Sequence, residues 1–73
     1  MELLTVKEVA KRLKVNPNYV YKLMNKGYIQ YLVLGKKKIT DFELERFLRE
    51  SQGKDFTDLD NIKEIEIKEE IWI

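Results

Sequence analysis

Two short amphipathic helices joined by a very short link restrict the fold of this chain more than any other sequence feature. The first helix is predicted to start at Thr5. There Thr5 and Glu8 form a capping box, in which each side chain accepts a hydrogen bond from the backbone N–H of the other residue. Its apolar residues recur at i, i+3, i+4 and i+7, which places them on one face. These residues are Val6, Val9, Ala10 and Leu13. One side of this helix must therefore be covered by other parts of the chain.

The second helix is predicted to begin almost directly after the first one ends. Asn16 is a good N-cap, and Pro17 suits the first helical position because the N–H that proline lacks would be unpaired there anyway. Gly27 is suited to the left-handed conformation that ends many helices. The inward face consists of Val20, Leu23 and Met24. The link at residues 14–16 is therefore a tight turn, and the two helices have the helix-turn-helix layout.

Residues of strand type follow the second helix and then turn back. Residues 28–34 are mostly aromatic or aliphatic, Gly35 supports a turn, and residues 38–39 return as a second strand. This pattern predicts a short hairpin with a basic tip. Thr40 and Glu43 form a second capping box, which starts a third helix that ends near residue 51. The apolar stripe of this helix consists of Leu44, Phe47 and Leu48.

The C-terminal extension, residues 53–73, alternates apolar and polar residues from residue 64 onward, and only Glu69 interrupts the apolar side. That period predicts a strand. A lone strand must pair with an edge, so we expect it to add to a sheet, either against its own hairpin or across a dimer. Phe42 lies off the stripe of its helix and is expected to be covered by this extension or by a second copy. Trp72 suits either packing on its own domain or anchoring a partner.

The composition of the chain limits the classes of protein to which it can belong. A chain of 73 residues suits a single domain, and it contains no Cys and no His, the commonest metal ligand and general base. An enzyme is therefore the least expected class, and neither a cofactor nor a metal site is predicted. No apolar run approaches the roughly 18 residues of a membrane span, and the N-terminus does not resemble a signal peptide. We expect a cytoplasmic protein with no membrane partner.

Charge is distributed unevenly although the net charge is only +1. Between residues 7 and 38 there are nine positively charged side chains and one acid, whereas residues 51–73 contain three lysines and seven acids. A basic lobe followed by an acidic extension suggests a polyanionic partner for the lobe. A lysine- and glutamate-rich soluble surface is the alternative. The three acids Asp55, Asp58 and Asp60 lack the glycine and closing glutamate of a metal-binding loop, and we interpret them as a solvated acidic linker.

Amide, phenol and ammonium groups on the outward side of the second helix are suited to DNA. Asparagine can pair with adenine in the major groove, lysine can reach guanine or phosphate, and tyrosine can donate to phosphate. The candidates in its first turn and a half are Asn18, Tyr19 and Lys22. Tyr19 or Tyr21 can instead pack against the hairpin as part of the core. Three adjacent lysines at the hairpin tip repel one another, and contact with phosphate would relieve this, although a solvated turn is the alternative.

Several of these motifs together resemble the excisionase-type, MerR-like winged helix-turn-helix family. The resemblance covers about residues 3–49 and is carried by LLTVKEVAKRL at residues 3–13, VNP at 15–17, VYKL at 20–23, Gly27 and LGKKKI at 34–39. It implies an α+β fold, a small winged helix-turn-helix with a two-helix unit, a β-hairpin wing and a third helix. This domain would occupy residues 1–52, followed by the C-terminal extension, residues 53–73, which is predicted to contain a strand.

The resemblance also implies which side chains contact DNA. On the second helix these are Asn18, Tyr19, Tyr21 and Lys22, and on the wing they are Lys36, Lys37 and Lys38. The candidate set also contains Lys26, at the end of the second helix. Lysine stands where arginine is frequent in the family, which favours contact with phosphate over recognition of guanine by the wing. The long coiled coil and effector domain of full MerR-type regulators have no counterpart, so ligand sensing is not implied.

The sequence therefore predicts a DNA-binding protein without catalytic activity. It would bind double-stranded DNA in a sequence-specific way, with the second helix in the major groove and the wing on the backbone or in the minor groove. Its role would be that of an excisionase-like architectural factor or a small transcriptional regulator. The predicted partners are double-stranded DNA and either a recombinase or a second copy of the chain. The alternative is a protein-interaction module that uses the acidic, Ile- and Trp-containing extension.

Overall fold

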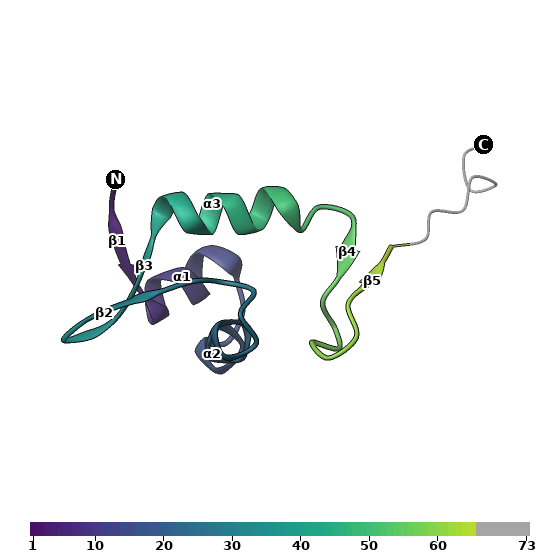
Figure 1. The fold of residues 1–73 in the computed structure, drawn as a ribbon, viewed down its shortest axis with the longest axis horizontal. Helices are drawn as coiled ribbons and strands as arrows, with labels where there is room; N and C mark the ends of the chain where they lie inside the picture. The colour runs from purple at the N-terminus through teal and green to yellow at the C-terminus, as the bar shows by residue number, and fades with distance from the viewer. Residues whose placement is uncertain (66–73) are drawn as a thin grey trace.

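Three helices and a three-stranded antiparallel sheet enclose a small core, and a second, two-stranded hairpin follows the third helix (Figure 1). The computed structural model describes residues 1–65. The elements in chain order are β1 (Leu3–Thr5), α1 (Val6–Leu13), α2 (Pro17–Asn25), β2 (Leu32–Leu34), β3 (Lys36–Thr40), α3 (Asp41–Glu50), β4 (Lys54–Asp55) and β5 (Lys63–Glu64). The fold is α+β and corresponds to the small winged helix-turn-helix that the sequence predicts. No helix within residues 1–65 has both the length and the apolar character needed to cross a membrane.

Capping interactions start the helices where the sequence predicts. The hydroxyl of Thr5 accepts the Glu8 N–H at 3.1 Å, and the Glu8 carboxylate accepts the Thr5 N–H at 2.9 Å. The Asn16 side chain accepts the Asn18 N–H at 2.8 Å at the start of α2, and the Thr40 hydroxyl accepts the Glu43 N–H at 3.0 Å at the start of α3. These bonds satisfy backbone donors that have no partner within the helix. The second predicted capping box is only half formed, because the Glu43 carboxylate accepts hydrogen bonds from the Gln30 N–H and from Arg46 instead of from the Thr40 N–H.

The turn between α1 and α2 is closed by a residue in the left-handed conformation. Lys14 has φ 59°, and the N–H of Val15 donates to the carbonyl of Ala10 at 3.0 Å. At the end of α2, Gly27 has φ 84°, a value that glycine adopts without the steric cost of a side chain. Lys14 and Gly27 thus end the two helices, and α2 lies at the surface of the domain.

The sheet contains a strand that the sequence analysis missed. The N-terminal strand β1 pairs with β3, with Leu4 opposite Ile39, and β2 pairs with the other side of β3, with Val33 opposite Lys37. The strand order is therefore β1-β3-β2. The predicted strand at residues 28–29 is absent from the described structure, and Ile29 instead lies in the core. The hairpin β2–β3, which we call the wing, turns at Gly35. The turn was predicted to extend over residues 35–37, but Lys36 and Lys37 already pair with β2 as part of β3.

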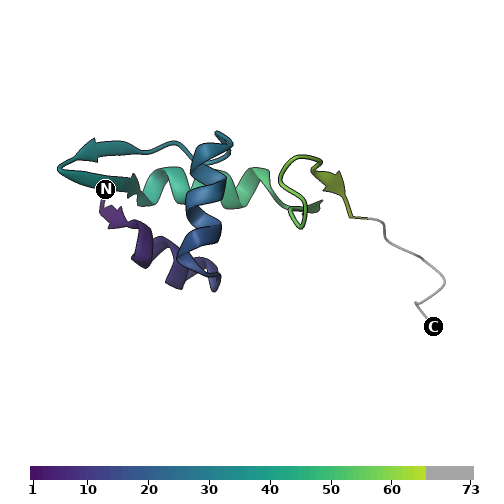
Figure 2. The same ribbon diagram turned by 90° about the horizontal axis from the view of Figure 1, so that it is seen from below.

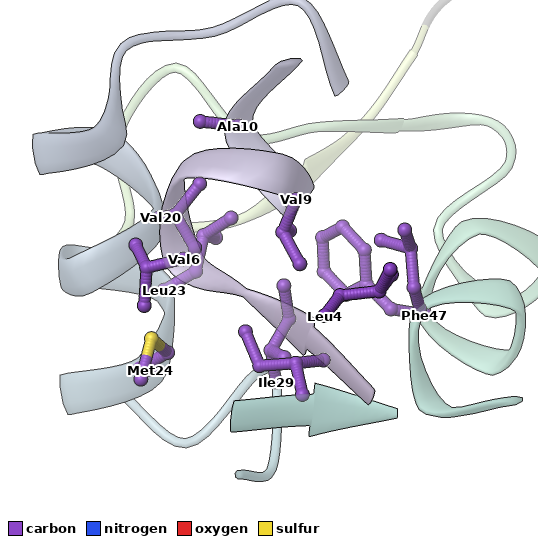
Figure 3. Packing of buried hydrophobic residues seen from close by; sticks show 11 residues of the cluster. Leu4, Val6, Val9, Ala10, Val20, Leu23, Met24, Ile29 and Phe47 are labelled. Carbon is purple, nitrogen blue, oxygen red and sulfur yellow. The ribbon is translucent and has the colours of Figure 1, made fainter. Parts of the chain in front are cut away.

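The core draws side chains from all three helices and from β1 and β3 (Figure 3). Its buried members are Leu4, Val6, Val9, Ala10, Val20, Leu23, Met24, Ile29, Ile39, Leu44 and Phe47. The predicted inward faces of α1 and α2 are thus buried, with Leu13 only partly so. Leu48 was predicted on the inward stripe of α3 but is 42% exposed. Phe42 was expected to be covered by the C-terminal extension or by a second copy. It is 64% exposed, and no residue within 1–65 covers it.

The C-terminal extension begins with a hairpin instead of a linker. Strands β4 and β5 pair antiparallel, with Lys54 opposite Glu64 and Asp55 opposite Lys63. The prediction that the extension pairs with the wing is therefore wrong for residues 63–64, because β4 supplies a nearer edge. The C-terminal hairpin, residues 54–64, lies beyond the end of α3 that is remote from the wing (Figure 1). The predictions for Ile67, Ile71, Trp72 and Ile73 lie outside the described residues.

Candidate nucleic-acid interface

Helix α2 crosses the domain between the wing and the C-terminal hairpin, as Figures 1 and 2 both show. The packing of its inward face against the core leaves the opposite side exposed. That side carries Asn18, Lys22 and Asn25, which follow one another at i, i+4 and i+7 and are all exposed. The outer face of α2 therefore presents two amides and one ammonium group in a single row, flanked by a different structural element on each side.

The wing forms the first flank of α2. The ammonium group of Lys37 lies 5.5 Å from the ring centroid of Tyr21 and 5.3 Å from that of Tyr31. Both distances lie within the range of a cation–π contact, which contributes roughly 0.5–1 kcal/mol at an exposed site. An open groove between the wing and the start of α1 is lined by Lys7 as well as by Tyr21 and Lys37. The wing thus holds positive charge close to the outer face of α2.

The three consecutive lysines of the wing alternate between the two faces of strand β3. Successive side chains of a strand point to opposite faces. Lys37 shares a face with the buried Ile39 and so faces α2, whereas Lys36 and Lys38 lie on the other face. Lys36 is exposed next to the turn, and Lys38 is half-buried opposite Leu32. Lys36 and Lys37 nevertheless both line the open groove beside Tyr21 and the start of α1.

The C-terminal hairpin forms the second flank of α2. The hydroxyl of Tyr19 donates to the carbonyl of Phe56 at 2.5 Å, and that of Tyr28 donates to the carbonyl of Leu59 at 2.6 Å. The Phe56 ring lies edge-on to Tyr28 and to Phe47, with centroid distances of 5.5 Å in both pairs. Tyr19 is half-buried, and burial, followed by the charge of Asp55, raises its pKa. Tyr19 therefore packs as part of the fold, but against the C-terminal hairpin and not against the wing.

Lys26 is also engaged by the C-terminal hairpin. Its ammonium group forms an ion pair and hydrogen bond with the carboxylate of Asp60, and this hydrogen bond is the main reason why the pKa of Lys26 is raised. Asp58 accepts the Asp60 N–H at 3.0 Å and so fixes the turn that carries both acids. The acidic segment was interpreted as a solvated linker. Its carboxylates are exposed, but the segment itself is folded against α2.

The structure adds residues that the sequence analysis did not select. Asn25 completes the outward row of α2, and its i+7 spacing from Asn18 was a usable signal. Tyr31 lies beneath Lys37, and Lys7 lines the groove beside the wing. Phe56 anchors the C-terminal hairpin, and the sequence analysis passed over it and Leu59 because the acids around them suggested a solvated segment.

The outer face of α2 and the wing offer hydrogen-bonding and positively charged groups to a ligand. Asn18 and Asn25 supply hydrogen-bond donors and acceptors, Lys22 supplies donors alone, and the wing supplies further ammonium groups. Within residues 1–65, no group of three or more Asp, Glu, His or Cys side chains is arranged to hold a metal ion. The surface is therefore best described by its hydrogen-bonding groups and its positive charge.

The chain resembles one known protein family over most of its length. A search of curated proteins found no significant match, and a search of solved structures found none either. A family model described as a helix-turn-helix domain matches residues 3–52, which is more than half of the chain. The matched residues include α1, α2, the wing and α3 and end just before the C-terminal hairpin. The chain therefore belongs to the helix-turn-helix domain family, of the excisionase- and MerR-like type.

Proposed function

We propose that this protein binds double-stranded DNA in a sequence-specific way. In this proposal, the outer face of α2 enters the major groove and the wing contacts the backbone or the minor groove. The protein acts as an excisionase-like architectural factor or as a small transcriptional regulator. Membership of the helix-turn-helix domain family supports the DNA-binding part of this proposal.

The observation that carries the proposal is the exposed row of Asn18, Lys22 and Asn25 beside the cationic wing. Asparagine presents a donor and an acceptor that match the major-groove edge of adenine, and lysine reaches guanine or phosphate. In helix-turn-helix proteins the second helix approaches base edges and the surrounding groups hold the backbone. The wing lysines are suited to the second task, since an ammonium group interacts with phosphate as a point charge.

The size of the domain suggests how it is used. A single DNA-binding module buries roughly 600–1,000 Å² of its own surface against DNA. That area limits the affinity of one copy. The proposal therefore includes binding by two copies at adjacent sites, or together with a partner such as a recombinase.

A mobility-shift assay with genomic fragments, followed by selection of bound sequences from a random duplex library, tests this function. The proposal predicts that one sequence is retained over scrambled duplexes. Equal retention of all duplexes would contradict sequence-specific binding, and retention of none would contradict DNA binding altogether.

The salt dependence of binding supplies an independent test. If α2 and the wing neutralise about four phosphates, the slope of log K against log salt should be roughly −4. Replacing Lys36 and Lys37 together by alanine should flatten that slope by about 0.9 for each phosphate that is no longer neutralised. The same change should weaken binding to specific and scrambled duplexes alike. A slope near zero for the unmodified protein would contradict the phosphate contacts.

A further inference from the structure

We propose that Asp60 of the C-terminal hairpin withholds Lys26 from DNA and thereby confines the duplex to the side of α2 that faces the wing. This inference rests on the proposed function, which it deepens by naming the residue that sets the boundary of the DNA-contacting surface. Asp60 acts as a positioning residue, because it works through Lys26 and through the repulsion of phosphate.

The first step is the position of the C-terminal hairpin. It is fixed by the hydrogen bonds from Tyr19 and Tyr28 to its backbone carbonyls and by the packing of Phe56 between aromatic rings. These contacts involve half-buried groups, so they hold the turn at residues 57–60 against α2. The acids of that turn are therefore held at a defined place beside the outer face.

The second step is the charge that the turn brings there. The groove between the turn and α2 is lined by Lys22, Asn25 and Lys26 on one side and by Asp58 and Asp60 on the other. A phosphate that entered this groove would lie next to two carboxylates, and Lys26 would have to exchange its bond to Asp60 for one to phosphate. On the wing flank a phosphate would meet Lys37, whose contacts are aromatic rings and not acids.

The third step is the consequence for the site. Of the two positively charged residues near the end of α2, Lys22 has no ion pair within residues 1–65, whereas Lys26 is paired with Asp60. Each lysine that contacts a phosphate contributes to affinity through the release of a counterion. The pairing of Lys26 thus lowers the number of phosphates that the protein neutralises, and it does so only on the flank away from the wing.

A double-mutant cycle in the full chain tests this proposal, with a short mixed-sequence duplex as the probe. Affinity is measured at several salt concentrations for Lys26→Ala, Asp60→Asn and the combination of both. We expect Lys26→Ala alone to change affinity by less than about twofold. Asp60→Asn should raise affinity severalfold and steepen the salt slope by about 0.9, because Lys26 becomes free to contact one more phosphate. The combined variant should return to the slope of the unmodified protein.

Glu45→Gln is the matched control, because it also removes one negative charge from an exposed ion pair, but that pair joins Glu45 to Arg49 within α3. It should leave the salt slope unchanged. If Glu45→Gln and Asp60→Asn raised affinity equally, net charge would explain the effect and the proposal would be overturned. A clear reduction in affinity on Lys26→Ala, together with a flatter salt slope, would also overturn it, since Lys26 would then bind DNA despite Asp60.

The proposed function and this inference fail in different ways. Failure of the unmodified protein and of every variant to bind any duplex would overturn the proposed function itself. Binding that is equal in all variants, with one common salt slope, would overturn only the role of Asp60. Thermal unfolding of each variant establishes that the fold is retained.

Discussion

The two flanks of α2 carry the same kinds of side chain and use them differently. On the wing flank, Tyr21 is exposed and its ring faces the ammonium group of Lys37. On the other flank, Tyr19 is half-buried with its hydroxyl bonded to a backbone carbonyl, and Lys26 is paired with Asp60. A tyrosine and a lysine are therefore available to a ligand on one side and engaged within the fold on the other. The segment that packs beside the helix decides the role of each residue.

The largest effect is expected between the two flanks, on the outer face of α2. Asn18→Ala or Lys22→Ala should cost about 1–3 kcal/mol at the specific site and much less on scrambled DNA, because each variant removes a contact with a base. Fluorescence anisotropy with both duplexes measures the difference. Arg49→Ala is the control, since it removes one positive charge from an exposed position that belongs to α3 and not to α2 or the wing. If the Lys22 variant still distinguished the specific duplex from the scrambled one as well as the unmodified protein does, α2 would not be the element that recognises the DNA sequence.

The next effect concerns the anchor of the C-terminal hairpin. Phe56→Ala should lower the free energy of unfolding by about 2 kcal/mol, because the ring is half-buried and a fully buried one costs roughly 3–5 kcal/mol. Phe42→Ala is the matched control and should change stability by less than about 0.5 kcal/mol, since that ring is exposed. Chemical denaturation measures both values. Equal decreases for the two variants would mean that Phe56 does not anchor the hairpin.

A smaller effect separates the two tyrosines directly. Tyr19→Phe removes the hydroxyl that donates to the Phe56 carbonyl and should cost about 1 kcal/mol of stability. Tyr21→Phe keeps the ring beneath Lys37 and should leave the stability nearly unchanged. The comparison uses thermal unfolding of both variants under one set of conditions. If Tyr21→Phe were the more destabilising of the two, the assignment of the flanks would be reversed.

The smallest effect is expected from acid pH and should be confined to the C-terminal hairpin. Hydrogen bonds from Thr57 hold the pKa of Asp55 below its usual value of 3.8. A lowered pKa in the folded state means that the contribution to stability is present above the unfolded-state value and disappears as pH falls through the folded-state value. Amide hydrogen exchange near residues 55–57 should therefore quicken between about pH 4 and pH 2, after correction for intrinsic rates. Exchange protection that is independent of pH there would contradict this role of Asp55.

The helices and the wing were predictable because their signals are local. The capping box at Thr5, the caps at Asn16 and Thr40 and the glycines at positions 27 and 35 each act within a few residues of themselves. The apolar spacing then identified the buried faces of α1 and α2. The separation of Lys37 from Lys36 and Lys38 follows from an equally local rule, the two-residue period of a strand, and was therefore also within reach of the sequence.

The remaining features depend on contacts between distant segments. Strand β1 is only three residues long and exists because it pairs with β3, more than thirty residues later. The different fates of Tyr19 and Tyr21 depend on Phe56 and on the carbonyl groups of the C-terminal hairpin. A backbone carbonyl leaves no mark in the sequence, and Phe56 and Leu59 lie in an acidic segment that the sequence analysis interpreted as solvated. Local patterns therefore predicted which residues of α2 face outward but not which of them remain available.

Chemical-shift mapping by heteronuclear NMR tests the central claim most directly, because it reports both flanks in one experiment. The ¹⁵N-labelled protein is titrated with its selected duplex, and the shifts of every backbone amide are followed. The account predicts that the largest changes occur at residues 18–25 of α2 and residues 35–37 of the wing, with smaller changes at residues 57–60. Changes concentrated in the C-terminal hairpin or on α3, with α2 unaffected, would contradict it.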